Sequence, residues 1–387
     1  MVSVAYLDHA ASTPMHPEAL EAMREYHEGC YANPTGAHRM AREARRAIDD
    51  ARDVLAEALG ARPGEIVFCG SGTEADNLAV FGAAAGSGVV VCSAVEHPAV
   101  LRPTERLAGR IVGVDGDGMP DLEALAAALD GDVRLVSVML ANNETGVAWS
   151  LEEVAEVMAR HAPQALLHTD AVQAFPWLDV AARAGRADLI SVSAHKFGGP
   201  KGVGALVVRG GVGLQAQIVG GGQEAERRSG TPNVAGIVGM AAAAAITVAR
   251  RAETTERVRR LRDRLADGLR AAVDGVVESG VRPASGRGVP VDRSAKVAGS
   301  CHLCFEGVES EALLFLAERG GVYASAASSC ASGAENPSHV LAAMGYPRSL
   351  ARGSLRLSLG AASTDADVHT ALNVISQAVT QLRRAVA

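Results

Sequence analysis

The sequence lacks an apolar run long enough to cross a membrane. A membrane-spanning helix needs about 18 to 20 consecutive apolar residues, and the longest run here, around Gly239 to Val248, is alanine-rich and much shorter. The N-terminal residues also show no basic stretch followed by an apolar one, which a secretion signal requires. We therefore expect a cytoplasmic protein with no membrane partner.

Lysine is scarce, and so is positive charge in general. Lysine occurs only at Lys196, Lys201 and Lys296, against 34 arginines, so any reaction that needs a lysine amine must use one of these three. The 44 acidic residues outnumber the 37 basic ones, and the formal net charge is −7. Such a chain lacks the basic surface of a nucleic-acid-binding protein, so we expect no direct nucleic-acid partner.

Disulfide bonds and metal sites are not expected either. The chain has six cysteines, and thiols stay reduced in the cytoplasm. Cys301 and Cys304 form a CxxC pair, a spacing that can bind metals or carry redox chemistry. However, the segment Val297 to Phe305 has the pattern of a strand, in which residues three apart point to opposite faces. The two thiols then cannot bind one ion.

The chain of 387 residues is long enough for two domains. Up to Val208, short apolar runs alternate with helical patterns, which favours an α/β fold with a mostly parallel sheet covered on both faces. Seven strands are expected, at Glu65–Cys69, Val89–Ser93, Arg110–Val114, Leu135–Leu140, Ala165–Thr169, Leu189–Val192 and Ala205–Val208. Helices are expected between many of them, for example at Thr73–Ala84, Leu122–Leu129 and Leu151–Arg160.

The pattern changes after a long helical region, Val234–Val273, which we expect to be interrupted near Ala252–Thr255. Beyond it we expect strands at Val276–Val281, Lys296–Phe305 and Leu355–Leu359, and helices at Ser310–Arg319 and Asp365–Ala385. This mixture predicts a smaller α+β domain. We assign residues 15–255 to a large domain, and residues 1–14 and 256–387 to a small one.

Chemical signals lie at the ends of predicted strands. The run Gly70-Ser71-Gly72-Thr73-Glu74 follows a strand and opens a helix, so its free N–H groups and the positive end of the helix dipole suit a phosphate. A glycine turn before a capped helix explains the run equally well. The run matches neither GxxxxGK[ST] nor GxGxxG, so neither a P-loop nor a dinucleotide fingerprint is supported.

Two further strand ends carry reactive groups. Asp170 and Gln173 follow one strand, where a carboxylate faces a ligand crevice or caps a helix. Ser193, His195 and Lys196 follow the next strand, and a buried lysine there is suited to forming an imine. A lysine, a carboxylate for a pyridinium nitrogen and a helix N-terminus for a phosphate are the combination that pyridoxal phosphate needs.

An ordered set of motifs resembles the class V aminotransferase family, and within it the cysteine desulfurase branch. The motifs are Tyr6–Pro14, Asn33-Pro34, Ser71–Glu74, Glu96-His97, Asn142–Gly146, His168–Gln173, His195-Lys196, Gly199–Gly202, Arg228–Pro232, Ser329-Cys330 and Arg356–Gly360. They run in the family's order along nearly the whole chain. The resemblance implies the fold type I of pyridoxal-phosphate-dependent transferases.

The resemblance also implies a role for each matching residue. Lys196 would bind the cofactor covalently and move the substrate's Cα proton, and His97 would stack on the cofactor ring. The remaining cofactor contacts would come from Gly72, Thr73, Asn143, Asp170, Gln173, Ser193, His195 and Thr231. By family analogy Thr231 reaches the neighbouring subunit's phosphate, which implies a homodimer. Asn33 and Arg356 would bind the substrate carboxylate. No metal is implied.

Cys330 points to the desulfurase branch. Its surroundings, Ala326 to Pro337, are small and polar, so we expect a flexible loop rather than the apolar site of a buried thiol. The spacing from Cys330 to Ser338-His339 resembles the desulfurases with a long catalytic loop. The expected reaction converts L-cysteine to L-alanine and leaves the sulfur on Cys330 as a persulfide.

Alternatives remain open at this point. A class V aminotransferase or a selenocysteine lyase needs no loop cysteine, and a sulfur-relay scaffold would only accept a persulfide on Cys330. The sulfur acceptor is also open, because iron–sulfur cluster assembly, tRNA thiolation and DNA phosphorothioation all begin with such a persulfide. In each case the expected partner is a sulfur-acceptor protein.

Overall fold

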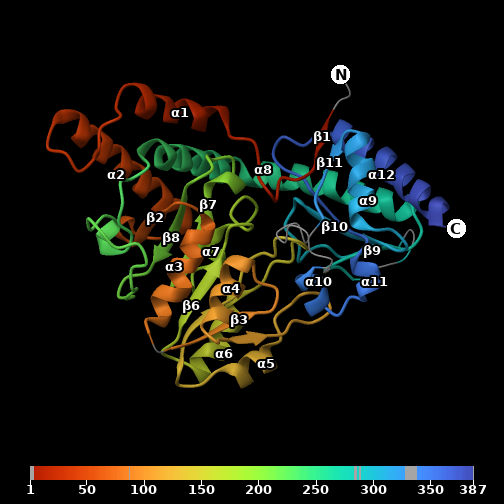
Figure 1. Ribbon diagram of the computed structural model, residues 1–387, viewed down its shortest axis with the longest axis horizontal. Coiled ribbons are helices and arrows are strands. Elements are labelled where there is room, and N and C mark those ends of the chain that lie inside the picture. The colour runs from red at the N-terminus through yellow and green to blue at the C-terminus, as the bar shows by residue number, and fades with distance from the viewer. Residues whose placement is uncertain (1–3, 87, 283–285, 287–288, 327–337, 387) are drawn as a thin grey trace.

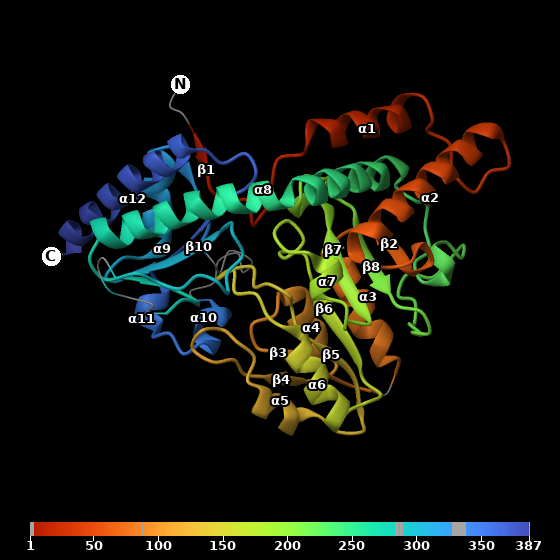
Figure 2. The same cartoon turned by 180° about the vertical axis from the view of Figure 1, so that it is seen from behind.

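The computed structural model describes residues 4–86, 88–282, 286, 289–326 and 338–386 (Figure 1). A large sheet with helices on both faces forms one part of the molecule, and a smaller α+β part lies beside it (Figure 1). The N- and C-termini both lie at the smaller part. The long helix α8 (Val234–Ala272) runs along both parts, as Figure 2 shows from behind.

The large sheet has seven strands in the order β2-β8-β7-β6-β5-β3-β4. Their bounds are Ile66–Cys69 (β2), Val89–Ser93 (β3), Arg110–Val112 (β4), Val133–Ser137 (β5), Leu166–Asp170 (β6), Leu189–Ser193 (β7) and Gly204–Val208 (β8). Only β8 is antiparallel to its neighbours, β2 and β7, and the other pairs are parallel. The predicted mostly parallel sheet is confirmed, and all seven predicted strands form.

Successive side chains along these strands belong to two hydrophobic clusters, one on each face of the sheet. Val67 and Val90 lie in the cluster that α3 (Gly72–Ala84) covers together with α4 (Pro98–Arg106). Phe68 and Val91, the next residues along, belong to the main cluster on the other face. There the covering helices are α2 (Arg39–Leu59), α5 (Leu122–Ala128), α6 (Leu151–His161), α7 (Val180–Arg183) and the first half of α8. Burial on both faces explains why the strands contain few polar residues.

Helix α8 is continuous from Val234 to Ala272, so the interruption predicted near residues 252–255 is wrong. Ile237 packs into the core of the large part and Leu265 into the core of the small part. Packing at both ends therefore keeps the helix continuous through Thr254 and Thr255, which are weak helix formers. Helix α1 (Pro17–Glu28) also packs along α8.

Among the described residues, α8 is the one helix whose length and apolar character would allow it to cross a membrane. An 18-residue window of it has a mean hydropathy of 1.4, and 44% of that window is buried inside the protein. A buried core helix passes the same test, and α8 packs against α1, α2 and the C-terminal helix α12 (Asp365–Val386). The packing of α8 accounts for its apolar surface.

The small part is built on a three-stranded antiparallel sheet in the order β12-β10-β9. Its elements are β9 (Val276–Glu278), β10 (Ser300–Phe305), β12 (Ser354–Ser358), α9 (Ser310–Arg319), α10 (His339–Ala343) and α11 (Arg348–Ala351). A two-stranded parallel sheet joins β1 (Ala5–Tyr6) to β11 (Val322–Tyr323). Strand β10 begins later than predicted because Val297 N–H donates to the Gly146 carbonyl instead of to a strand.

The CxxC pair lies on β10, and its two thiols are buried in different places. Cys301 belongs to the core of the small part, whereas Cys304 packs with Leu341 and Ala351 on the opposite face. The prediction that the two thiols point to opposite faces of a strand is therefore confirmed. Among the described residues, no group of histidines, cysteines and carboxylates is arranged to hold a metal ion.

Candidate functional site

The neighbouring parallel strands β6 and β7 end side by side and place their terminal residues together. Asp170 is the last residue of β6 and is 5% exposed, and its Oδ1 accepts a hydrogen bond from Val172 N–H at 2.8 Å. Burial raises the pKa of Asp170 to about 6, opposed by that hydrogen bond and by the charge of Lys196. A buried carboxylate thus faces a lysine at the edge where the sequence predicted a ligand crevice.

Lys196 lies in the short 3-10 helix Ala194–Lys196 that follows β7. Its Nζ donates to the carbonyls of Ala10, at 2.6 Å, and Ala11, at 2.8 Å. Gln173 Nε2 donates to the same Ala10 carbonyl at 2.9 Å. The segment before α1 therefore crosses the strand ends and holds the lysine and the glutamine of the predicted site together.

The N-terminus of α3 approaches the end of β7 closely. A Cβ added to Gly72 would lie 2.9 Å from a Val172 methyl carbon and 3.2 Å from the Ser193 Cβ, so the approach requires glycine. Ser71 Oγ caps the helix by accepting from Glu74 N–H at 3.1 Å. Thr73, in the first turn, is exposed. This 13-residue helix directs its N-terminal N–H groups to the place predicted for a phosphate.

Two histidines at the site are held neutral. Burial, together with the charges of Lys196, His339 and Arg356, lowers the pKa of His97 to about 4. Burial together with Lys196 and Lys201 likewise lowers the pKa of His195 to about 4. His97 is the N-cap of α4, where its Nδ1 accepts from Ala99 N–H at 3.1 Å. An uncharged imidazole ring beside Lys196 suits stacking on an aromatic cofactor.

Arg356 lies on β12, so the small part of the molecule also contributes a side chain to the site. It donates to Asp8 Oδ1 at 3.0 Å and to the Asn143 carbonyl at 3.1 Å. The Arg356 Nε and the Asn143 Oδ1 are buried and find no hydrogen-bond partner among the described residues. These orphaned groups indicate that a polar ligand completes the site. Sequence reasoning missed the role of Asp8, because Asp8 lies 348 residues from Arg356.

Three predicted site residues are not brought to this cluster within the described residues. Asn33 is exposed, and its side chain accepts from Thr35 N–H at 3.0 Å and Thr35 Oγ1 at 2.9 Å. Thr231 is exposed and lines a small pocket with Gly70. Cys330 lies outside the residues that the structure describes. Their assigned roles stay predictions.

A cavity of about 560 Å³ opens beside Lys196 and extends between the two parts of the molecule. Its walls include Asn143, Gln173, Trp177 and Phe197. A cavity of this size admits a ligand of the size of a cofactor or an amino acid. Neither of the other two lysines lines it: Lys201 is exposed on a glycine-rich turn, and Lys296 is buried elsewhere.

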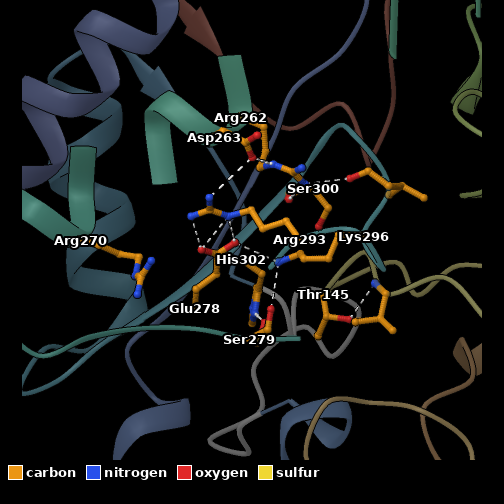
Figure 3. A network of polar contacts seen from close by, with 12 residues as sticks. Thr145, Arg262, Asp263, Arg270, Glu278, Ser279, Arg293, Lys296, Ser300 and His302 are labelled. Carbon is orange, nitrogen blue, oxygen red and sulfur yellow. Dashed lines mark hydrogen bonds and ion pairs between the residues drawn. The ribbon is translucent and has the colours of Figure 1, made fainter. Parts of the chain in front are cut away.

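Figure 3 shows the buried polar network that contains Lys296. Lys296 Nζ donates to Glu278 Oε1 at 3.4 Å and to the Ser279 carbonyl at 2.9 Å. Arg293 also binds Glu278, with its Nη2 2.7 Å from Oε2. The backbone of Lys296 bridges to that of Val147, next to the Asn142–Gly146 motif. The network therefore fixes the loop that carries Asn143, and Lys296 has a structural role.

We predict that Glu278→Gln destabilises the fold by roughly 3 to 5 kcal/mol at pH 7, because it leaves the buried Lys296 without its anion and removes one of the three carboxylates that pair with Arg293. Although burial alone would raise the pKa of Glu278, Lys296 and Arg293 lower it to about 2. The stabilisation is thus present above about pH 4.5 and is lost as the pH falls toward 2. The wild type should lose about 3 kcal/mol more than the variant over that range.

Urea unfolding at a series of pH values measures both effects. Glu256→Gln is the matched control, since Glu256 forms exposed ion pairs with Arg259 and Arg260 and should contribute less than about 1 kcal/mol. A Glu278→Gln protein as stable as this control would contradict the assignment.

The described residues fit pyridoxal phosphate. Lys196 supplies the amine and Asp170 the buried carboxylate for a pyridinium nitrogen. The N-terminus of α3 and Ser193 suit the phosphate, and the neutral ring of His97 suits stacking. The orphaned Asn143 Oδ1 supplies a further polar contact. The bonds from Lys196 and Gln173 to Ala10 show that the strand ends and the N-terminal segment already meet around this position.

Comparisons with known proteins agree with this arrangement. The family model described as aminotransferase class-V matches residues 5–370. An IscS-like cysteine desulfurase of Mycobacterium tuberculosis is 43% identical over 397 aligned residues, which cover 99% of this chain and 98% of the relative.

Solved structures give the same result. One described as a NifS-like protein superposes with a TM-score of 0.87 at 32% identity and covers 98% of this chain and 100% of its own. Another, described as SspA in complex with cysteine, has a TM-score of 0.76 at 29% identity and covers 93% of this chain and 100% of its own. The match of the family model over almost the whole chain confirms what the motifs predicted: the chain belongs to the class V aminotransferase family.

Proposed function

We propose that the protein is a pyridoxal-phosphate-dependent cysteine desulfurase. It converts L-cysteine to L-alanine and retains the sulfur as a persulfide on Cys330. The observation that carries the proposal is the meeting of Lys196, Asp170, His97 and Arg356 in one site beside the N-terminus of α3. The similarity to an IscS-like cysteine desulfurase over 99% of the chain supports it.

Each residue of the cluster has a task that its contacts suit. Arg356 binds the substrate carboxylate, and Asp8 and the Asn143 carbonyl hold the guanidinium in place. Lys196 Nζ takes and returns the proton on the substrate's Cα. Asp170 keeps a proton on the cofactor's ring nitrogen. When bound, pyridoxal phosphate supplies the electron sink that makes the bonds at Cα and Cβ labile.

Cys330 carries the sulfur step. Its thiolate attacks the sulfur of the substrate, an S–S bond forms and the Cβ–S bond breaks, with its electron pair passing to the substrate carbon. A proton then completes the methyl group of alanine. Cysteine and the Cys330 thiol thus yield alanine and the Cys330 persulfide, with no external oxidant or reductant.

Three finer statements belong to the same proposal. A homodimer would bring Thr231, which is exposed, to the phosphate of the neighbouring subunit. A sulfur-acceptor protein would collect the persulfide for iron–sulfur clusters, tRNA thiolation or DNA phosphorothioation. A cytoplasmic location suits the five cysteines within the described residues, which are all free thiols.

We predict that Asp170→Asn retains bound cofactor but loses about 10²-fold or more of its activity. A neutral amide cannot hold the proton on the ring nitrogen, so the electron sink weakens. Cofactor content by absorbance and alanine formation by chromatography measure the two effects separately. A variant that turns over at nearly the wild-type rate would remove Asp170 from this role.

We predict that Arg356→Ala mainly weakens cysteine binding. The loss of a charge-assisted pair should cost about 2 to 3 kcal/mol, or roughly 30- to 150-fold in kcat/KM. Asp8→Asn is the companion variant, because it keeps the guanidinium but loosens it, and it should show a smaller effect in the same direction. An unchanged kcat/KM in Arg356→Ala would place the substrate carboxylate elsewhere.

We predict that Cys330→Ser keeps its cofactor and still binds cysteine but does not release alanine. A serine hydroxyl is a far poorer nucleophile toward sulfur than a thiolate. Peptide mass spectrometry of the wild type after exposure to cysteine should find one extra sulfur on Cys330. Cys69 and Cys92 serve as internal controls, since burial raises the pKa of both thiols and keeps them protonated.

If Cys330→Ser makes alanine at the wild-type rate, Cys330 is not the sulfur acceptor. A lyase that needs no loop cysteine, as in the selenocysteine lyase alternative, then takes its place.

A further inference from the structure

Ser338 and His339, the first described residues after residues 327–337, bind directly to neighbours of site residues. The Ser338 hydroxyl forms a short hydrogen bond with Glu144 Oε2, and Glu144 follows Asn143 in the chain. His339 Nε2 lies 3.0 Å from the carbonyl oxygen of Glu96, which precedes His97. The residues at which the chain leaves the segment 327–337 therefore contact two different parts of the candidate site, next to Asn143 and next to His97.

Glu144 is held firmly enough to act as an anchor. Glu144 is only 3% exposed. Its backbone N–H donates to Asn142 Oδ1 at 2.9 Å, and its backbone carbonyl accepts from Ser300 Oγ at 3.3 Å. The adjoining Asn143 carbonyl accepts from Arg356. Glu144 therefore lies next to one of the contacts that hold Arg356, while Asp8 holds the same guanidinium independently.

Ser338 is equally constrained. It is 2% exposed and caps α10, because its Oγ accepts from Leu341 N–H at 3.2 Å. The Ser338 oxygen accepts from Leu341 N–H, and the hydroxyl hydrogen can then donate to Glu144 Oε2. The bond thus fixes the position of Ser338 as well as the start of the helix.

The chain before the segment is attached to the same site. Ser325 exchanges two backbone hydrogen bonds with Arg356, of 3.2 Å and 2.8 Å. Cys330 lies between Ser325 and Ser338 in the sequence. The described residues on either side of it are therefore anchored to the substrate-binding arginine and to the Asn142–Gly146 motif.

We propose that Glu144 is a positioning residue for sulfur transfer. Through Ser338 it fixes the point at which the chain leaves residues 327–337, and through Asn143 it keeps that point in register with Arg356. The inference rests on the proposed function. It predicts a defect in the transfer of sulfur to Cys330 that leaves cofactor binding and cysteine binding intact.

The test uses the holoenzyme and five variants. Glu144→Leu removes the acceptor, Ser338→Ala removes the donor, and the double variant removes both. Glu144→Gln keeps an acceptor oxygen and serves as the conservative rescue. Asp121→Ala is the matched control for the lost helix cap, since Asp121 caps α5 by accepting from Ala124 N–H at 2.9 Å and contributes nothing to the Glu144–Ser338 contact.

Three quantities are measured: the cofactor spectrum, its change on adding cysteine, and the single-turnover rate of alanine and persulfide formation. We expect the two spectra to stay as in the wild type. The rate should fall about tenfold in Glu144→Leu, as for one lost hydrogen bond. The rate in the double variant should be no lower than in Glu144→Leu alone. Glu144→Gln and Asp121→Ala should keep the wild-type rate.

A second readout separates this inference from the proposed function. Relative to the wild type, the rate at which iodoacetamide alkylates Cys330 should change by the same factor in Glu144→Leu, in Ser338→Ala and in the double variant. This change is expected whether or not the enzyme makes alanine. If the wild type makes no alanine but this pattern appears, the anchor stands and the desulfurase assignment fails. If transfer and alkylation match the wild type in Glu144→Leu, or if its cofactor spectrum is lost in parallel, the positioning role is wrong.

Discussion

The hydrogen bonds of the segment Asp8–Ala11 determine how the site is assembled. Asp8 holds Arg356 of the small part, while the carbonyls of Ala10 and Ala11 receive the amine of Lys196 in the large part. A short extended segment near the N-terminus thereby links the lysine to the arginine. The Asn143 carbonyl, which also accepts from Arg356, adds a second link between the two parts.

Burial then sets the charge of each group at the site. The histidines beside Lys196 are neutral because their pKa values fall to about 4, so the positive charge is concentrated on Lys196 and Arg356. Glu96 and Glu144, both buried, have pKa values raised by burial to about 8 and about 7. A proton on these acids removes negative charge that would compete with Asp170 and with a substrate carboxylate for the two cations.

Much of the fold and the core of the site follow from the sequence, for a specific reason. In a mostly parallel sheet, the carboxyl ends of neighbouring strands meet, so Asp170 and Lys196 could be placed together from local patterns alone. Gly72 could be placed beside them because its glycine-rich turn opens a helix. The fold assignment succeeded because buried strands of β-branched residues are distinctive.

Contacts between distant segments could not be predicted in this way. Asp8 is 348 residues from Arg356 and Glu144 is 194 from Ser338, and no local pattern links either pair. The predicted break in α8 failed for a related reason, since distant packing at both ends overrides the weak helical preference of its middle. Asn33 binds Thr35 in its own turn, and its assigned contact with the substrate carboxylate stays a prediction.

The central claim is that Lys196 is the residue that binds pyridoxal phosphate. Reduction of the holoenzyme with borohydride fixes an imine as a stable secondary amine, and peptide mass spectrometry then locates the added pyridoxyl group. The structure predicts the group on Lys196, beside Asp170, with none on the exposed Lys201 or on Lys296, which is paired with Glu278. A pyridoxyl group on Lys201 or Lys296, or none at all, would contradict the account.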